Sequence, residues 1–133
     1  MGLDNGFVVQ GLKRKDIPSF VALPHIDKCY DNSDKVEIAY YRKCWGLRDA
    51  VLRVLHAPQS GGQFQVEAED IPAIVDAIRP FFSKECWDDK GDSIWSFAEV
   101  FHYTLVQQII NLQWLYSYMT VHPEVTCYFY DSY

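Results

Sequence analysis

The segment 34–56 constrains the fold more than any other part of the chain, because its apolar residues recur on two sides of a helix. Asp34, followed by Glu37 three residues later, resembles a capping box, and Pro58 lies just beyond the other end. One stripe consists of Tyr40, Cys44, Leu47, Val51, Val54 and Leu55, and the other of Tyr41, Trp45, Arg48 and Leu52. Because a surface helix usually has one apolar stripe, this pattern predicts a central helix with packing on both sides.

Shorter patterns predict three strands and two further helices. The expected strands, which are short apolar or alternating runs between turn residues, are 7–10, 63–67 and 125–130. A second helix is expected to begin at Asp70, and a third to run from a capping box at Ser96 to His122. The order β-α-β-α-α-β predicts a single α+β domain over 1–133, with a small, about three-stranded, mainly antiparallel sheet packed with three helices.

Two stretches lack this periodicity. Residues 13–32 contain two prolines and a basic start, and they predict either a long ordered loop or a pair of short extended pieces. Residues 83–92 are polar and carry an acidic run, which predicts a linker between the second and third helices.

Composition narrows the class of protein. The 133 residues carry a net charge of −6, and this charge argues against non-specific binding of nucleic acid, which needs a cationic surface. No signal-peptide pattern opens the sequence, and no apolar run approaches the roughly 18 residues of a membrane span. We therefore expect a cytoplasmic protein with no membrane association.

The chemistry-bearing residues form no known motif. Four cysteines and four histidines are scattered without the spacings of a zinc site, and no phosphate loop, nucleophile elbow or catalytic triad order is present. We therefore expect no cofactor, no metal and no identifiable catalytic residue, and the sequence leaves open whether the protein is an enzyme.

Three short motifs suggest a relationship. They are the start Met1-Gly2-Leu3-Asp4, the run Glu37-x-x-Tyr40-Tyr41-Arg42-Lys43 and the tail Tyr128-Phe129-Tyr130-Asp131-Ser132-Tyr133. The chain resembles a family of small uncharacterised bacteriophage and prophage proteins, although Tyr41 stands where Trp is more usual and Arg48 where His is frequent. The resemblance implies a phage or mobile-element accessory protein in the cytoplasm of a bacterial host, and it implies no mechanism.

The first functional hypothesis is a protein that binds a host protein, for example a component of a bacterial defence system. It follows from the resemblance, the 16% of aromatic residues and the missing catalytic motifs. The expected contact residues are the acidic Asp88, Asp89 and Asp92 and the terminal aromatic Tyr128, Tyr130 and Tyr133.

The alternative hypothesis is a small-ligand protein, which either binds a nucleotide or phosphate or acts on it. In this interpretation Arg42, Lys43 and Arg48 hold phosphate groups while Tyr40 or Trp45 stacks on a base. The same charges could instead form ordinary ion pairs along the helix while the aromatic rings fill the core. The oligomeric state is open, since a two-sided helix suits either a domain centre or a dimer seam.

Overall fold

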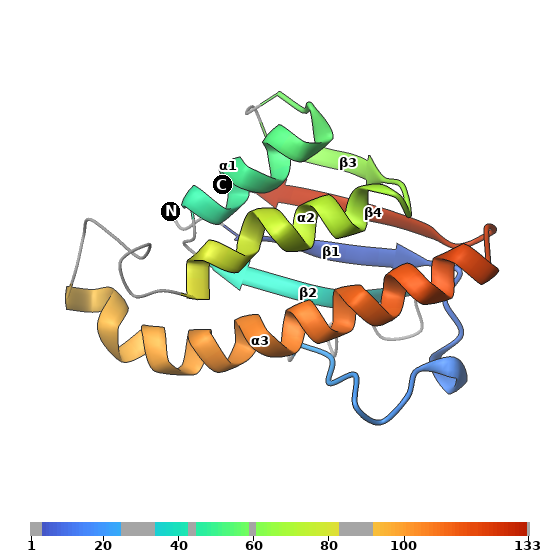
Figure 1. Cartoon of the computed structure of the whole chain (residues 1–133), viewed down its shortest axis with the longest axis horizontal. Helices are drawn as coiled ribbons and strands as arrows, with labels where there is room; N and C mark the ends of the chain where they lie inside the picture. The colour runs from blue at the N-terminus through green and yellow to red at the C-terminus, as the bar shows by residue number, and fades with distance from the viewer. Residues whose placement is uncertain (1–3, 25–33, 43–44, 59–60, 83–91, 133) are drawn as a thin grey trace.

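The protein forms one antiparallel sheet covered on one face by three helices, as Figure 1 shows for a computed structural model. The structure describes residues 4–24, 34–42, 45–58, 61–82 and 92–132. The elements are β1 (Asp4–Gln10), the 3-10 turn η1 (Arg14–Asp16), β2 (Lys35–Arg42), α1 (Trp45–Leu55), β3 (Gly62–Val66), α2 (Asp70–Ile78), the 3-10 turn η3 (Arg79–Phe82), α3 (Asp92–Val121) and β4 (Thr126–Ser132). The predicted α+β class is confirmed.

The prediction for segment 34–56 was wrong in its first half. Residues 35–42 form β2, which pairs with β1 along its length, and α1 begins only at Trp45. The sheet therefore has four strands, in the order β2-β1-β4-β3, and not about three. Val36, Glu37, Ile38 and Ala39 are all at most 1% exposed. A β-bulge at Ile38, opposite Phe7 and Val8, interrupts the alternation along β2, so its pattern also fits two sides of a helix.

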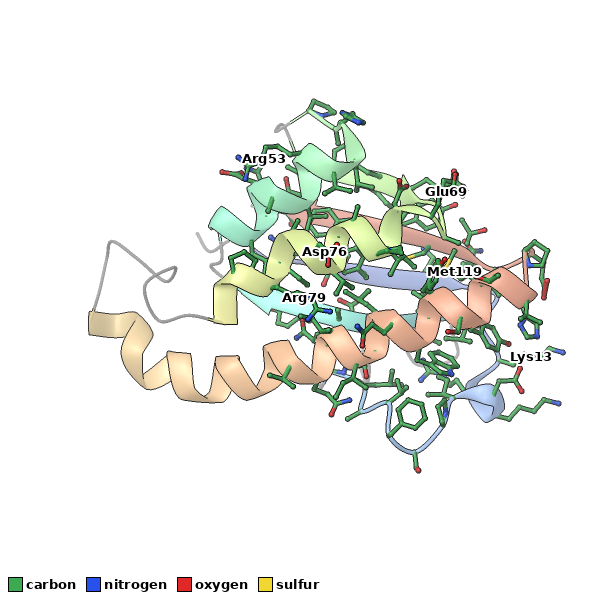
Figure 2. The ribbon with its side chains drawn as sticks, in the orientation of Figure 1. Lys13, Arg53, Glu69, Asp76, Arg79 and Met119 are labelled. Atoms are coloured by element: carbon green, nitrogen blue, oxygen red, sulfur yellow. The ribbon has the colours of Figure 1, made fainter. Side chains whose placement is uncertain are left out.

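The other elements lie close to their predicted places. β1 and β4 are longer than expected, and α3 begins at Asp92, four residues before the predicted start. Asp76 of α2 and Arg79 of η3 form a surface ion pair whose Oδ1 and Nε atoms are 3.5 Å apart (Figure 2). Residues 25–32 of the predicted loop and 83–91 of the predicted linker lie outside the described residues.

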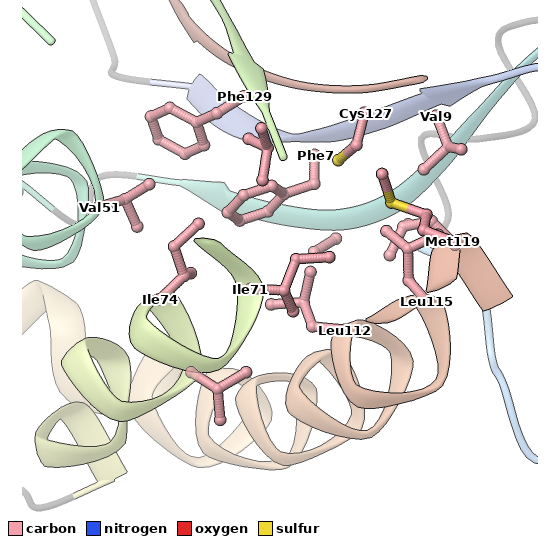
Figure 3. Packing of buried hydrophobic residues seen from close by; sticks show 14 of the residues in the cluster. Phe7, Val9, Val51, Ile71, Ile74, Leu112, Leu115, Met119, Cys127 and Phe129 are labelled. Carbon is pink, nitrogen blue, oxygen red and sulfur yellow. The ribbon is translucent and has the colours of Figure 1, made fainter. Parts of the chain in front are cut away.

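The core lies between the sheet and the helices. Phe7 of β1 and Phe129 of β4 are cross-strand partners, and their ring centroids are 5.0 Å apart (Figure 3). The apolar sides of α2 and α3 close over these rings, with Ile71, Ile74 and Leu112 at most 1% exposed. Each such side chain contributes roughly 1.5–3 kcal/mol through burial, so this layer supplies the main stabilisation of the fold.

α3 also covers the edge of the sheet formed by β2. The side-chain amide of Gln108 donates to the Tyr40 carbonyl at 2.6 Å, and that of Asn111 donates to the Ile38 carbonyl at 3.0 Å. Asn111 further donates to the carbonyl of Ala22 at 2.9 Å. These side chains satisfy backbone carbonyls that an edge strand otherwise leaves open. Within the described ranges, no helix is both long and apolar enough to cross a bilayer.

Gly6 allows the close approach of β2 to β1, and its replacement is expected to destabilise the fold. A Cβ atom at this position would clash with the Ala39 carbonyl oxygen and would lie 2.7 Å from Oε1 of Glu37. We expect Gly6→Ala to lower the free energy of unfolding by at least about 2 kcal/mol, because the backbone must shift. Urea denaturation measures this loss. Gly46→Ala, at an exposed position in the first turn of α1, is the control and should leave stability unchanged or slightly raised.

The Tyr118 hydroxyl ties α3 to η1 and predicts a dependence of stability on alkaline pH. It donates to Oδ2 of Asp16 at 2.6 Å. This hydrogen bond, with burial and the nearby carboxylates, raises the pKa of Tyr118 to about 12. The unfolded chain releases this proton near pH 10, so the contribution of Tyr118 is complete below pH 10 and is lost as the pH rises to about 12.

Urea denaturation at about pH 9, about pH 10.5 and about pH 12 tests this contribution of Tyr118 to stability. Tyr118→Phe is expected to be less stable than the wild type at the lowest pH, and the difference should shrink as the pH rises. A difference that stays constant over this range would contradict the assignment.

Candidate functional site

The face of the sheet away from the helices carries a group of tyrosines. Alternation along β4 places Phe129 on the helical side and Tyr128 and Tyr130 on the other side. On β1, Gly6 and Val8 share the side of these tyrosines. No described helix lies on this side of the sheet (Figure 1), which we call the open face.

The strand register arranges the open face in two rows. One row runs Tyr40, Gly6, Tyr130 and Gln63 across β2, β1, β4 and β3, and the next runs Glu37, Val8, Tyr128 and Gln65. The three tyrosines are each partly exposed, and Gln63 and Gln65 are exposed. The fold therefore brings Tyr40 together with Tyr128 and Tyr130, which the sequence analysis had placed in separate candidate sites.

A buried carboxylate holds one of these rings in place. The Tyr130 hydroxyl donates to Oε1 of Glu37 at 2.5 Å, and Glu37 is fully buried. The two residues lie on strands that flank β1, and the missing side chain of Gly6 leaves room for the carboxylate to cross that strand. Hydrogen bonds to a charged acceptor are short and strong, so Tyr130 is fixed in its orientation.

Arg48 lies on the opposite side of the sheet from Tyr40, and it is engaged by two carboxylates. Its Nε atom lies 2.9 and 2.8 Å from the oxygens of Asp131, and Nη1 lies 3.0 Å from Oδ1 of Asp49. The side chains of Arg48 and Asp131 are 5% and 0% exposed. Because the positive charge of this buried guanidinium is already paired with two carboxylates, it is not available to a phosphate. The position of Arg48 therefore disfavours the small-ligand hypothesis.

An unsatisfied amide lies beside this ion pair. Asn5 is the partner of Asp131 in the β1–β4 pairing and is fully buried, and neither polar atom of its side chain has a hydrogen-bond partner. Such a group costs about 1–3 kcal/mol. The core thus has a polar end, formed by Asn5, Arg48 and Asp131.

The remaining predicted site residues are placed only in part. Lys43, Asp88, Asp89 and Tyr133 lie outside the described residues. Arg42, Trp45 and Asp92 are located by backbone only, as the last residue of β2 and the first residues of α1 and α3. Their role as contact or ligand residues stays a prediction.

The described residues contain no group of three His, Cys, Asp or Glu side chains that could hold a metal ion. Cys127 faces the core, where burial, and to a smaller extent the charge of Glu37, raises the pKa of its thiol well above the usual range. A protonated, inaccessible thiol is a poor nucleophile, so Cys127 serves packing.

Sequence reasoning missed Glu37, Gln63 and Gln65 as members of the open face. Glu37 was interpreted as a helix cap, although a single carboxylate inside an apolar run is also typical of a buried polar pair. Gln63 and Gln65 occupy the polar positions of a correctly predicted strand, and that alternation was the available signal.

Comparison with known proteins adds no relative: no family model, no curated protein and no solved structure matches this chain. The resemblance to phage proteins stays a prediction. We therefore infer function from the arrangement of the open face.

The buried ion pair yields a stability prediction. We expect Arg48→Met to lower the free energy of unfolding by about 3–5 kcal/mol, because it leaves the Asp131 carboxylate buried without a counter-charge. Combining it with Asp131→Leu should recover much of the loss, since that change removes the stranded charge. Urea denaturation of the single and double variants measures both effects.

Arg53→Met is the matched control, since Arg53 is an exposed arginine on the same helix. It should change stability by no more than about 0.5 kcal/mol. Equal effects of the two arginine substitutions would contradict a structural role for the Arg48 pair.

Proposed function

We propose that this protein acts by binding a host protein, and that the open face is its contact surface. The observation that carries the proposal is the gathering of Tyr40, Tyr128 and Tyr130 on one side of the sheet. Tyrosine supplies a large, rigid contact area and a polar tip, and it is enriched at protein interfaces. Partly exposed tyrosines from two distant segments suit such a surface.

The rigidity of the open face supports affinity. Tyr130 stands on a central strand, and its hydroxyl is bound by Glu37, so little side-chain freedom remains to be lost on association. A contact surface that is ordered before binding avoids about 0.5–1.5 kcal/mol per immobilised side chain.

The chemistry of the open face indicates the kind of partner. Gln63, Gln65, Val8 and the tyrosines present neutral polar and apolar groups, and these suit a partner surface of the same character. The net charge of −6 favours a basic rim on that partner through electrostatic steering. With the resemblance to phage proteins, we propose a cytoplasmic protein of the bacterial host, such as a component of a defence system.

Capture from host lysate with two tyrosine variants tests the proposal. Tyr128 makes no hydrogen bond through its hydroxyl among the described residues, so Tyr128→Ala should leave the fold intact. We expect this variant to weaken binding by roughly thirtyfold, which corresponds to about 2 kcal/mol at an interface hot spot. Quantitative mass spectrometry of the retained proteins, followed by calorimetry with the purified partner, measures the loss.

Tyr116→Ala is the matched control, because Tyr116 is a 40% exposed tyrosine on α3, on the helical side of the sheet. It should retain the partner as the wild type does. Equal loss with both variants would place the contact elsewhere. Failure of the wild-type protein to retain any host protein in stoichiometric amounts would contradict the proposed function.

A further inference from the structure

β3 forms an edge of the sheet that is open to a further strand. It pairs with β4 on one side. On its other side, the part of the chain that the structure describes supplies no strand and no hydrogen bond. The edge at β2 differs, because Gln108 and Asn111 of α3 donate hydrogen bonds to its carbonyls.

The residues of β3 do not protect this edge. The strand reads Gly-Gln-Phe-Gln-Val, without a charged residue or a proline, and its pairing with β4 runs without a bulge. Natural edge strands usually carry lysine, proline or a bulge, which prevents pairing with another chain. The lack of these features at an exposed edge favours addition of a strand.

We infer that β3 pairs with β3 of a second copy of this chain, antiparallel and centred on Phe64. This register places the two Phe64 side chains opposite each other and Gln63 opposite position 65 of the second copy. Phe64 is partly exposed although it lies on the core side of β3. Opposed aromatic rings and opposed amides each stabilise a cross-strand pair, so the strand is complementary to itself.

Charges at the two ends of β3 favour this antiparallel arrangement. Glu67 follows the strand and is exposed, and the register places it opposite position 61, a glycine, of the second copy. The exposed Arg53 and Glu69 lie toward opposite ends of β3 (Figure 2). An antiparallel pair therefore keeps the acidic ends of the two copies, with Glu67 and Glu69, apart, whereas a parallel pair would align them.

The dimer has a two-fold axis perpendicular to the sheet, so both open faces lie on the same side. Strands of five residues form a small contact, of the class below about 1,200 Å² that gives weak association. We therefore expect the dimer to depend on protein concentration. This inference does not depend on the proposed function, since it concerns the edge of the sheet and is measured by self-association. Gln63 and Gln65 also belong to the open face, so their variants are not used to measure host-protein binding.

Sedimentation velocity of the full-length protein over a concentration series tests the inference with two matched double variants. Q63K/Q65K places like charges opposite each other twice across the contact, and it should raise the dimer dissociation constant roughly tenfold. Q63K/Q65E places a lysine opposite a glutamate twice and should restore the dimer. Both sites are exposed, so circular dichroism should show an unchanged fold.

A wild-type protein that stays monomeric up to its solubility limit would overturn the inference, and the edge would then be free for a strand from another protein. A dimer that survives in Q63K/Q65K would also overturn it, because the contact would lie elsewhere. Failure of Q63K/Q65E to restore the dimer would exclude the register centred on Phe64.

Discussion

The pairing of β1 with β4 is the interaction on which the rest of the structure depends. These strands come from the two ends of the chain and lie at the centre of the sheet, paired in register from Asp4 with Ser132 to Gln10 with Thr126. On the helical side this pairing aligns Phe7 with Phe129, around which the core forms. On the other side it aligns Gly6 with Tyr130 and so creates the open face.

One substitution-sensitive position links the core and the open face. Gly6 allows the Glu37 carboxylate to reach Tyr130 across β1. The carboxylate is fully buried and yet it orients a side chain at the surface. Because a buried charge is costly unless it is hydrogen-bonded, the hydrogen bond from the Tyr130 hydroxyl stabilises the fold as well as orienting the Tyr130 ring. The chain thus uses a single hydrogen bond to stiffen the surface that we propose for binding.

The sequence predicts those elements whose periodicity is set by one buried side. α2 buries one stripe of its surface, and β4 buries every second residue. Both were predicted with small errors at their ends. β2 was mistaken for a helix because the β-bulge at Ile38 interrupts the alternation that identifies a strand. The pair Arg48–Asp131 joins residues 83 apart in the sequence, and no local pattern indicates such a contact. Tyr128 and Tyr130 were predicted as contact residues, whereas their proximity to Tyr40 depends on strand order, which local patterns do not contain.

The two edges of the sheet differ, and this difference limits how copies of the chain can assemble. Hydrogen bonds from α3 occupy carbonyls of β2, so that edge is a poor acceptor for another strand. If only β3 can pair with another copy, an antiparallel β3–β3 contact uses the same surface on both copies and leaves no second open edge. Such an isologous contact closes on itself. An exposed, uncharged edge strand would otherwise risk continued edge-to-edge growth, and here the covered β2 edge stops assembly at two copies.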